Sequence, residues 1–154
     1  MASGSTVFVD AGVLLSADDG ADPVRYQRAR DWLRALWTRR LGRLSSQVLT
    51  EYYAIATQRL APAMPQGDAR AEVRRYQHWK PWQIDHQTVE TAWAVEARFQ
   101  VPWWSALIVA AAQHQGCRYV LTESLAHGQQ IDSVQVVNPF IAGPEILDTD
   151  TPLT

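Results

Sequence analysis

The sequence predicts a three-layer α/β/α sandwich built on a mainly parallel central sheet. Short runs of β-forming apolar residues alternate along the chain with longer segments whose apolar side chains recur at helical spacing. This alternation is typical of α/β domains, in which helices cover both faces of the sheet. The 154 residues fit one domain, which we expect at 6–141, between an N-terminal segment 1–5 that is disordered or a tag remnant and a C-terminal tail 142–154.

The individual elements follow from signals at their ends. Asp22-Pro23 is typical of a helix start, because aspartate caps free N–H groups and proline fits the first helical position. Pro102 opens another helix, and Gly116 is suited to end it. In chain order we expect a strand at 6–9, a helix at 23–40, a strand at 44–46, helices at 47–60, 68–79, 87–99 and 102–115, and strands at 118–121 and 134–137.

Composition excludes several classes of protein. With 47% hydrophobic and 19% charged residues, and no apolar run near the roughly 20 residues that span a bilayer, the chain is not expected to be a membrane protein. The N-terminus lacks the pattern of a secretory signal. Cys117 is the only cysteine and cannot form an intramolecular disulfide, which agrees with a cytoplasmic location.

The charge distribution is uneven, although the net charge is only −2. The whole-molecule field therefore gives no reason to expect non-specific binding to nucleic acid. Positive charge is concentrated between residues 25 and 43, either on a solvated helix face or on a surface that contacts phosphates. The arginines concerned are Arg25, Arg28, Arg30, Arg34, Arg39, Arg40 and Arg43.

Asp10 and Glu123 each follow a predicted strand. Functional sites in such sheets gather beyond the carboxyl ends of the strands, so the topology brings these two acids to one edge. Asp10 also has a structural interpretation, because aspartate often caps a turn at the end of a strand. Glu51 interrupts an apolar stripe in the helix expected at 47–60, either as a buried carboxylate that needs a partner or a metal, or at the wet boundary of the stripe.

Four segments carry a resemblance to a known family. They are the strand that ends at Asp10, the run Leu44 to Tyr53 around Glu51, the run Arg98 to Ala112 with Trp103-Trp104-Ser105, and the run Cys117 to Gln129 with Thr122-Glu123-Ser124, followed by Val136 to Phe140. In this order, over about residues 6 to 140, they resemble a PIN domain of the VapC toxin type. The resemblance implies a PIN-like fold, an endoribonuclease that uses magnesium or manganese held by four carboxylates, a homodimer, and an antitoxin protein that keeps it inactive.

The chain departs from this pattern where the chemistry is expected. The third and fourth acid positions of the family correspond to Ser105 and Ser124, and Ala11-Gly12 replaces a small polar pair after Asp10. Magnesium and manganese prefer anionic oxygen. At about 5 Å and an effective dielectric of about 20, each lost carboxylate forfeits on the order of 6 kcal/mol of gross attraction to a divalent ion. We therefore expect cleavage to be weakened or lost.

Two hypotheses follow. In the first, the chain is a working ribonuclease that binds Mg²⁺ or Mn²⁺ weakly through Asp10, Glu51 and Glu123, with Ser105 and Ser124 acting directly or through water. In the second, it is a non-catalytic PIN domain, with no metal, retained to bind RNA or an antitoxin-like protein.

Other side chains near these segments have two interpretations each. His127 could approach the site as a metal ligand or could brace its loop. Trp103 and Trp104 could stack bases or could pack in a core or an interface. Neither serine has the neighbouring base that a nucleophile requires.

Overall fold

The computed structural model describes residues 5–149. The predicted N-terminal segment, apart from Ser5, and residues 150–154 of the predicted tail lie outside the described residues. Five strands form one sheet in the order β2-β1-β3-β5-β4. Neighbouring strands run parallel except for β4, which is antiparallel to β5 at one edge. The sheet is mainly parallel, as predicted, and its strands are β1 (Val7–Val9), β2 (Gly42–Arg43), β3 (Tyr119–Leu121), β4 (Gln130–Ile131) and β5 (Val134–Val137).

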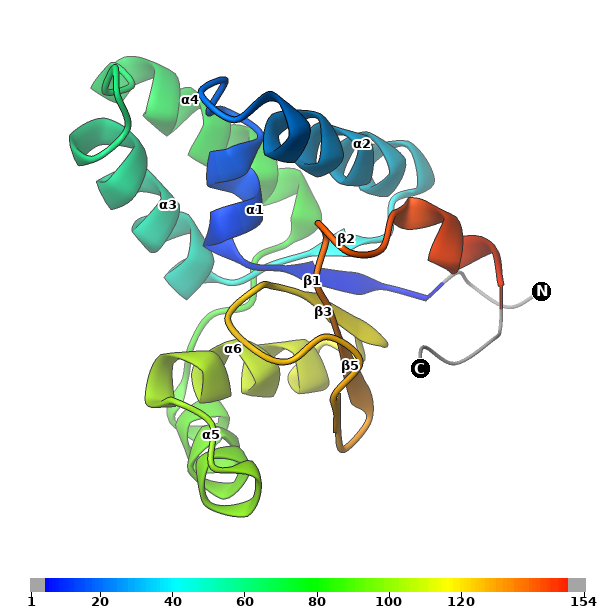
Figure 1. The fold of residues 1–154 in the computed structure, drawn as a ribbon. Helices are drawn as coiled ribbons and strands as arrows, with labels where there is room; N and C mark the ends of the chain where they lie inside the picture. The colour runs from blue at the N-terminus through cyan, green and yellow to red at the C-terminus, as the bar shows by residue number, and fades with distance from the viewer. Residues whose placement is uncertain (1–4, 150–154) are drawn as a thin grey trace.

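Helices cover both faces of the sheet, which confirms the three-layer architecture. Figure 1 shows α1 and α2 on one side of the strands, and α5 and α6 on the other. Two 3₁₀ helices, η1 and η2, complete the described chain. The bounds are α1 (Ala11–Ser16), α2 (Pro23–Arg39), α3 (Ser46–Gln58), α4 (Gln66–Arg75), η1 (Tyr76–Trp79), α5 (His86–Phe99), α6 (Trp103–His114) and η2 (Pro144–Asp148).

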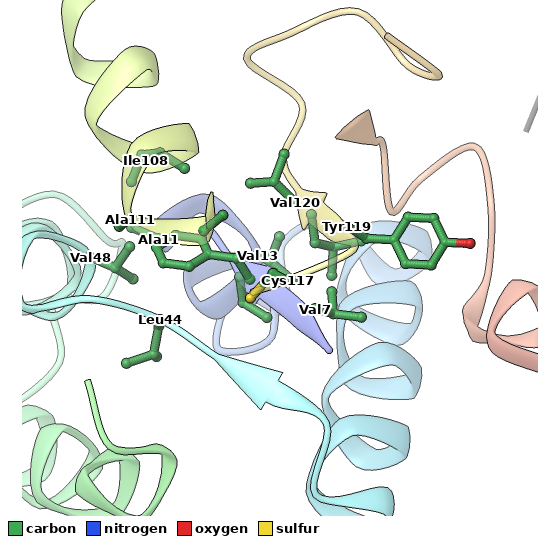
Figure 2. Packing of buried hydrophobic residues seen from close by; sticks show 14 of the residues in the cluster. Val7, Ala11, Val13, Leu44, Val48, Ile108, Ala111, Cys117, Tyr119 and Val120 are labelled. Carbon is green, nitrogen blue, oxygen red and sulfur yellow. The ribbon is translucent and has the colours of Figure 1, made fainter. Parts of the chain in front are cut away.

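The core joins the sheet to both helix layers. Figure 2 shows Val7 and Val120 of the sheet among side chains from α1, α3 and α6. Helix α6 is buried from Ala106 to Ala112, which explains its nearly continuous apolar sequence. Cys117 belongs to this core, and burial raises the pKa of its thiol to about 11. The side chain is therefore a packing residue and not a nucleophile.

Several predicted boundaries hold. Asp22 caps α2 by accepting a hydrogen bond from the Arg25 amide at 3.2 Å, and Pro23 is the first helical residue. Gly116 has a φ of +69°, the left-handed conformation suited to the end of a helix. Within the segment predicted as a C-terminal tail, η2 packs against α2, and Arg39 pairs with Asp148 at 2.9 Å.

Other predictions were wrong. The strand predicted at 44–46 lies at Gly42–Arg43, because Ser45 is used to cap α3 and accepts from the Val48 amide at 3.4 Å. Helix α1 was missed, because Asp10-Ala11-Gly12 was interpreted as the end of a strand, whereas Asp10 starts a short helix. The helix predicted at 68–79 begins at Gln66 and changes to 3₁₀ geometry at Tyr76. The two-residue strand β4 is too short to give an alternating pattern.

None of the helices in residues 5–149 combines the length and the apolar composition that crossing a bilayer demands.

Gly42 offers a test of the packing under the edge strand. A Cβ atom at this position would lie 2.4 Å from the Trp79 ring, whose centroid is 5.0 Å from that of Trp37 and 4.9 Å from that of Tyr76. The ring cannot move without disturbing both neighbours, so we expect Gly42→Ala to lower the free energy of unfolding by about 1–3 kcal/mol in urea denaturation.

Gly67→Ala in α4 is the matched control. A Cβ atom there meets nothing within 4 Å, and alanine is the better helix former, so stability should rise by up to about 1 kcal/mol. Equal stability of the two variants would contradict the packing described for Trp79.

Candidate active site

The register of two strands brings Asp10 and Thr122 together. Val9 of β1 pairs with Leu121 of β3, so the residues that follow them emerge side by side at the carboxyl edge of the sheet. The Thr122 hydroxyl donates to Oδ2 of Asp10 at 2.7 Å, and the Ala11 amide donates to Oδ1 at 2.7 Å. Asp10 therefore caps α1 and also places a carboxylate at the predicted site.

A small pocket of about 200 Å³ opens beside this carboxylate. Glu51 reaches it from α3, and Ser124 reaches it from the loop after β3. The pocket thus brings together Asp10, Glu51, Glu123 and Ser124 of the predicted site residues. Its lining consists of Asp10, Ala11, Gly12, Val13, Leu15, Glu51, Ile55, Thr122, Glu123, Ser124 and Phe140.

Glu51 lies at the wet boundary of its helix, which was one of the two alternatives left open by its spacing. Val48 and Tyr52 are buried, whereas Glu51 is exposed as a whole residue although it lines the pocket. Partial desolvation raises the pKa of the Glu51 carboxyl, and the nearby charge of Asp10 raises it further. The two carboxylates therefore share one electrostatic environment.

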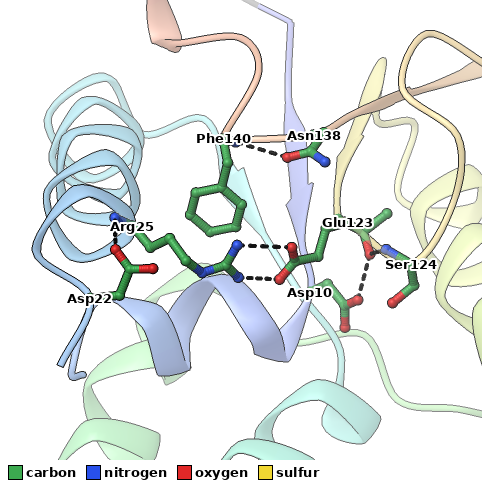
Figure 3. A network of polar contacts seen from close by, with 8 residues as sticks. Asp10, Asp22, Arg25, Glu123, Ser124, Asn138 and Phe140 are labelled. Atoms are coloured by element: carbon green, nitrogen blue, oxygen red, sulfur yellow. Dashed lines mark hydrogen bonds and ion pairs between the residues drawn. The ribbon is translucent and has the colours of Figure 1, made fainter. Parts of the chain in front are cut away.

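Glu123 is held by an arginine from α2. Arg25 donates through both terminal nitrogens to the Glu123 carboxylate, one of these hydrogen bonds measuring 3.1 Å, and its guanidinium lies 3.8 Å from the centroid of the Phe140 ring. Figure 3 shows Arg25 facing Glu123 and Asp10 on the other side of that carboxylate. The charge of Glu123 is thus already paired with a cation of the same chain, at a partly exposed position.

The two serines lie differently. The Ser124 amide donates to the Thr122 hydroxyl at 3.1 Å, which ties Ser124 to the Asp10 network. Ser105 lies in the first turn of α6 and is not among the described residues that line the pocket. Its link to α3 is indirect: Gln47, one turn before Glu51, donates to the Trp104 carbonyl at 3.4 Å.

The remaining candidates take structural positions. His127 accepts from the Asn138 amide at 3.0 Å and so braces the loop. Trp103 packs against the core and stacks on Trp93 with centroids 6.4 Å apart, whereas Trp104 is 67% exposed.

Comparison with known proteins decides the family. A family model for the PIN domain matches residues 7–123, which is more than half of the chain. The chain belongs to the PIN domain family. A search of curated proteins finds no match. Five solved chains match, and among them is a crystal structure of the sarcin-ricin loop cleaving toxin VapC20 of Mycobacterium tuberculosis. It shares 19% identity, covers 75% of this chain and 87% of its own, and has a TM-score of 0.59, which shows that the fold is shared.

The site of this PIN domain does not fit a firmly held divalent metal ion. Mg²⁺ and Mn²⁺ require several oxygen ligands, preferably anionic ones. Asp10 and Glu51 supply two carboxylates, Glu123 is neutralised by Arg25, and Ser124 adds a neutral hydroxyl. Within residues 5–149, no three His, Cys, Asp or Glu side chains are grouped so that they could hold a metal.

Sequence reasoning missed the partners of the acids. Thr122 is the first residue of the Thr122-Glu123-Ser124 motif, and the sequence analysis gave it no role. Its position directly after a strand that neighbours β1 could have predicted a contact with Asp10. The pairing of Arg25 with Glu123 joins residues 98 positions apart in the chain and has no local signal.

The structural role of Asp10 in this PIN domain can be separated from its charge. Asp10→Ala removes the cap of α1 and the acceptor of the Thr122 hydroxyl, so we expect a loss of about 1–2 kcal/mol in the free energy of unfolding. Asp10→Asn should keep most of the stability, because asparagine caps helices as well as aspartate and a threonine hydroxyl can donate or accept. Urea denaturation measures both. Equal losses would mean that the negative charge, and not the capping geometry, stabilises this corner.

The raised pKa of Glu51 predicts a pH-dependent gain on removing its charge. The folded state binds this proton more tightly than the unfolded state, so ionised Glu51 lowers stability above its folded pKa. This loss of stability is absent below pH 4.5, the ordinary pKa of the carboxyl, because Glu51 is then protonated in both the folded and the unfolded state. Glu51→Gln should therefore stabilise the protein at neutral pH by less than about 1 kcal/mol, because exposed charges are screened.

The comparison needs urea denaturation at neutral pH and at about pH 3.5, below both pKa values. Glu96→Gln on α5 removes the same charge away from the pocket and is the control. A gain for Glu51→Gln that persists at low pH would contradict this origin.

Proposed function

We propose that this chain is a VapC-type PIN domain whose metal-dependent cleavage of RNA is weakened or lost. Family membership and the fold shared with the VapC20 toxin support the toxin-type origin. RNA is the substrate class that goes with that origin. A cytoplasmic location, a homodimer and an antitoxin-like protein partner are further parts of the proposal.

The main support for the proposal is the identity of the residues at the four positions where the family has acids. Two retain carboxylates, Asp10 and Glu51, and two hold the serines Ser105 and Ser124. The adjacent acid Glu123 does not compensate, since Arg25 already binds it with both terminal nitrogens. Any metal that binds in the pocket would therefore meet two carboxylates that are not already paired with a cation.

The expected loss of affinity is large. Each missing carboxylate removes on the order of 6 kcal/mol of gross attraction at about 5 Å, and solvation cancels part of this amount. The substitution also relieves repulsion among clustered carboxylates, so serine at these positions favours the fold at the expense of metal binding.

A second candidate is a PIN domain with no catalysis, retained to bind an antitoxin-like protein or RNA. Val24 is 71% exposed and Ile141 is 62% exposed, and each is next to one partner of the Arg25–Phe140 contact at the pocket. Two exposed apolar side chains on segments that meet beside the site favour a contact surface. This candidate predicts a stable complex with a partner in the absence of cleavage.

Restoring the acids tests the proposal. Ser105→Asp/Ser124→Asp should raise the affinity for Mn²⁺ by roughly two orders of magnitude or more in calorimetric titration, because two charges return to the site. Metal-dependent cleavage of RNA should appear in the same variant.

Ser105→Asn/Ser124→Asn is the control, since asparagine has the size of aspartate without its charge. Asp10→Asn in the restored background should abolish the gain. Tight Mn²⁺ binding by the unmodified chain, with cleavage that Asp10→Asn removes, would overturn the proposal in favour of a working ribonuclease.

A further inference from the structure

A second pocket, of about 490 Å³, lies where α2, β2 and η1 meet. Its polar lining comes from Arg40, Arg43, His78 and Lys80, and its apolar lining includes Trp37 and Trp79. None of the described residues that line it is acidic. The pocket is therefore a local region of positive potential in a chain whose net charge is −2.

Two of the basic residues that line the pocket have a left-handed backbone conformation. Arg40 ends α2 with a φ of +58°, and Lys80 ends η1 with a φ of +52°. Glycine adopts this left-handed conformation without the steric cost that a side chain incurs. Only four non-glycine residues of the described chain have a positive φ, and two of them line this one pocket. This conformation commonly ends helices, as it does at Gln100 after α5, so here it fixes where the two side chains leave the backbone beside the pocket.

Cations at the ends of helices have an ordinary explanation, because they neutralise the last carbonyl groups. It accounts for Arg43, whose guanidinium donates to the Gly42 carbonyl at 2.8 Å and to the Arg40 carbonyl at 3.5 Å. It does not account for the Arg40 and Lys80 side chains, for which no hydrogen bond or ion pair forms within residues 5–149. On the same helix Arg25 and Arg39 each pair with an acid, whereas Arg28 and Arg34 form no ion pair within residues 5–149, so what distinguishes Arg40 is its place in the pocket.

The pocket is also held in shape before any ligand arrives. The Trp79 ring lies directly over Gly42, and its centroid is 5.0 Å from that of Trp37. Packed indoles make an apolar wall, and charges beside such a wall act through a lower effective dielectric than charges in open solvent. The indole wall therefore needs no rearrangement on binding, whereas the exposed Arg40 and Lys80 side chains become ordered only when a ligand binds them.

We infer that this basic pocket binds a phosphate group, supplied either by the backbone of an RNA strand or by a free nucleotide. The guanidinium of Arg40 and the ammonium of Lys80 offer unpaired donors to one anion, and Arg43 adds to the positive field. The inference does not rest on cleavage, because neither a metal nor any residue of the acidic pocket takes part.

The test uses a fluorescent oligouridylate of about ten nucleotides in the presence of a chelator, so that no metal contributes. In Arg40→Gly/Lys80→Gly the fold is not at risk, since glycine favours the conformation of both positions. We expect the affinity to fall roughly tenfold or more and the slope of log K against log salt to decrease by about 0.7 for each phosphate that the variant no longer neutralises. Arg40→Asn/Lys80→Asn should reproduce the result, because asparagine also tolerates a positive φ.

Arg28→Gln/Arg59→Gln is the matched control. It also removes two positive charges, one from α2 and one from the end of α3, and both lie outside the pocket. Competition by inorganic phosphate or uridine monophosphate indicates a site for a single phosphate, whereas displacement by unlabelled RNA alone indicates the backbone as the source.

Three results would overturn the inference. They are no binding by the unmodified chain, an equal fall in affinity in the control variant, and displacement by polyglutamate but not by RNA or phosphate, which would mean that the pocket serves an acidic protein. None of them depends on the Mn²⁺ titration, so failure here is distinguishable from failure of the proposed loss of cleavage.

Discussion

The parallel pairing of β1 with β3 is the constraint on which the acidic pocket depends. It sets Asp10 beside Thr122, and their hydrogen bond of 2.7 Å joins the start of α1 to the loop that carries Glu123 and Ser124. Asp10 is therefore a structural residue before it is a site residue, because it caps α1 whatever the pocket binds. Selection for folding alone can keep this carboxylate in place after metal chemistry is lost. Its presence is consequently weak support for catalysis, and the proposed loss of cleavage rests instead on the residues at 105 and 124.

Charge balance explains how the pocket stays stable with few acids. A cluster of carboxylates repels itself unless a cation neutralises it. Here Arg25 pairs with Glu123, Ser124 adds no charge to the pocket, and burial together with the charge of Asp10 still raises the pKa of Glu51. This arrangement agrees with the proposed loss of cleavage, since substitutions that remove function often remove strain as well.

The fold was largely accessible from the sequence, because it depends on local patterns that repeat. Asp22-Pro23 gave the start of α2, and the apolar run at 134–137 gave β5 with its observed bounds. The failures occurred where one residue type serves two purposes: Asp10 looked like the end of a strand, and Ser45 looked like part of one, although both cap helices. At the site, topology was enough to bring Asp10 and the residues after β3 to one edge. The Arg25–Glu123 pair could not be predicted, since it depends on how α2 packs and leaves no periodic trace in the sequence.

The two pockets lie toward opposite ends of β1. Gly42, in the wall of the basic pocket, pairs with Val7 at the start of β1, and Asp10 follows the end of β1 about 10 Å further along at the rise of an extended chain. The sheet thus separates a positive region from a negative one, and the substitutions at 105 and 124 alter only the latter. Binding of phosphate at the basic pocket requires no metal and no acid, so it can persist in a chain that no longer cleaves RNA. A PIN domain organised in this way can lose its nuclease chemistry and still hold RNA, which gives the non-catalytic alternative a physical basis independent of the acidic pocket.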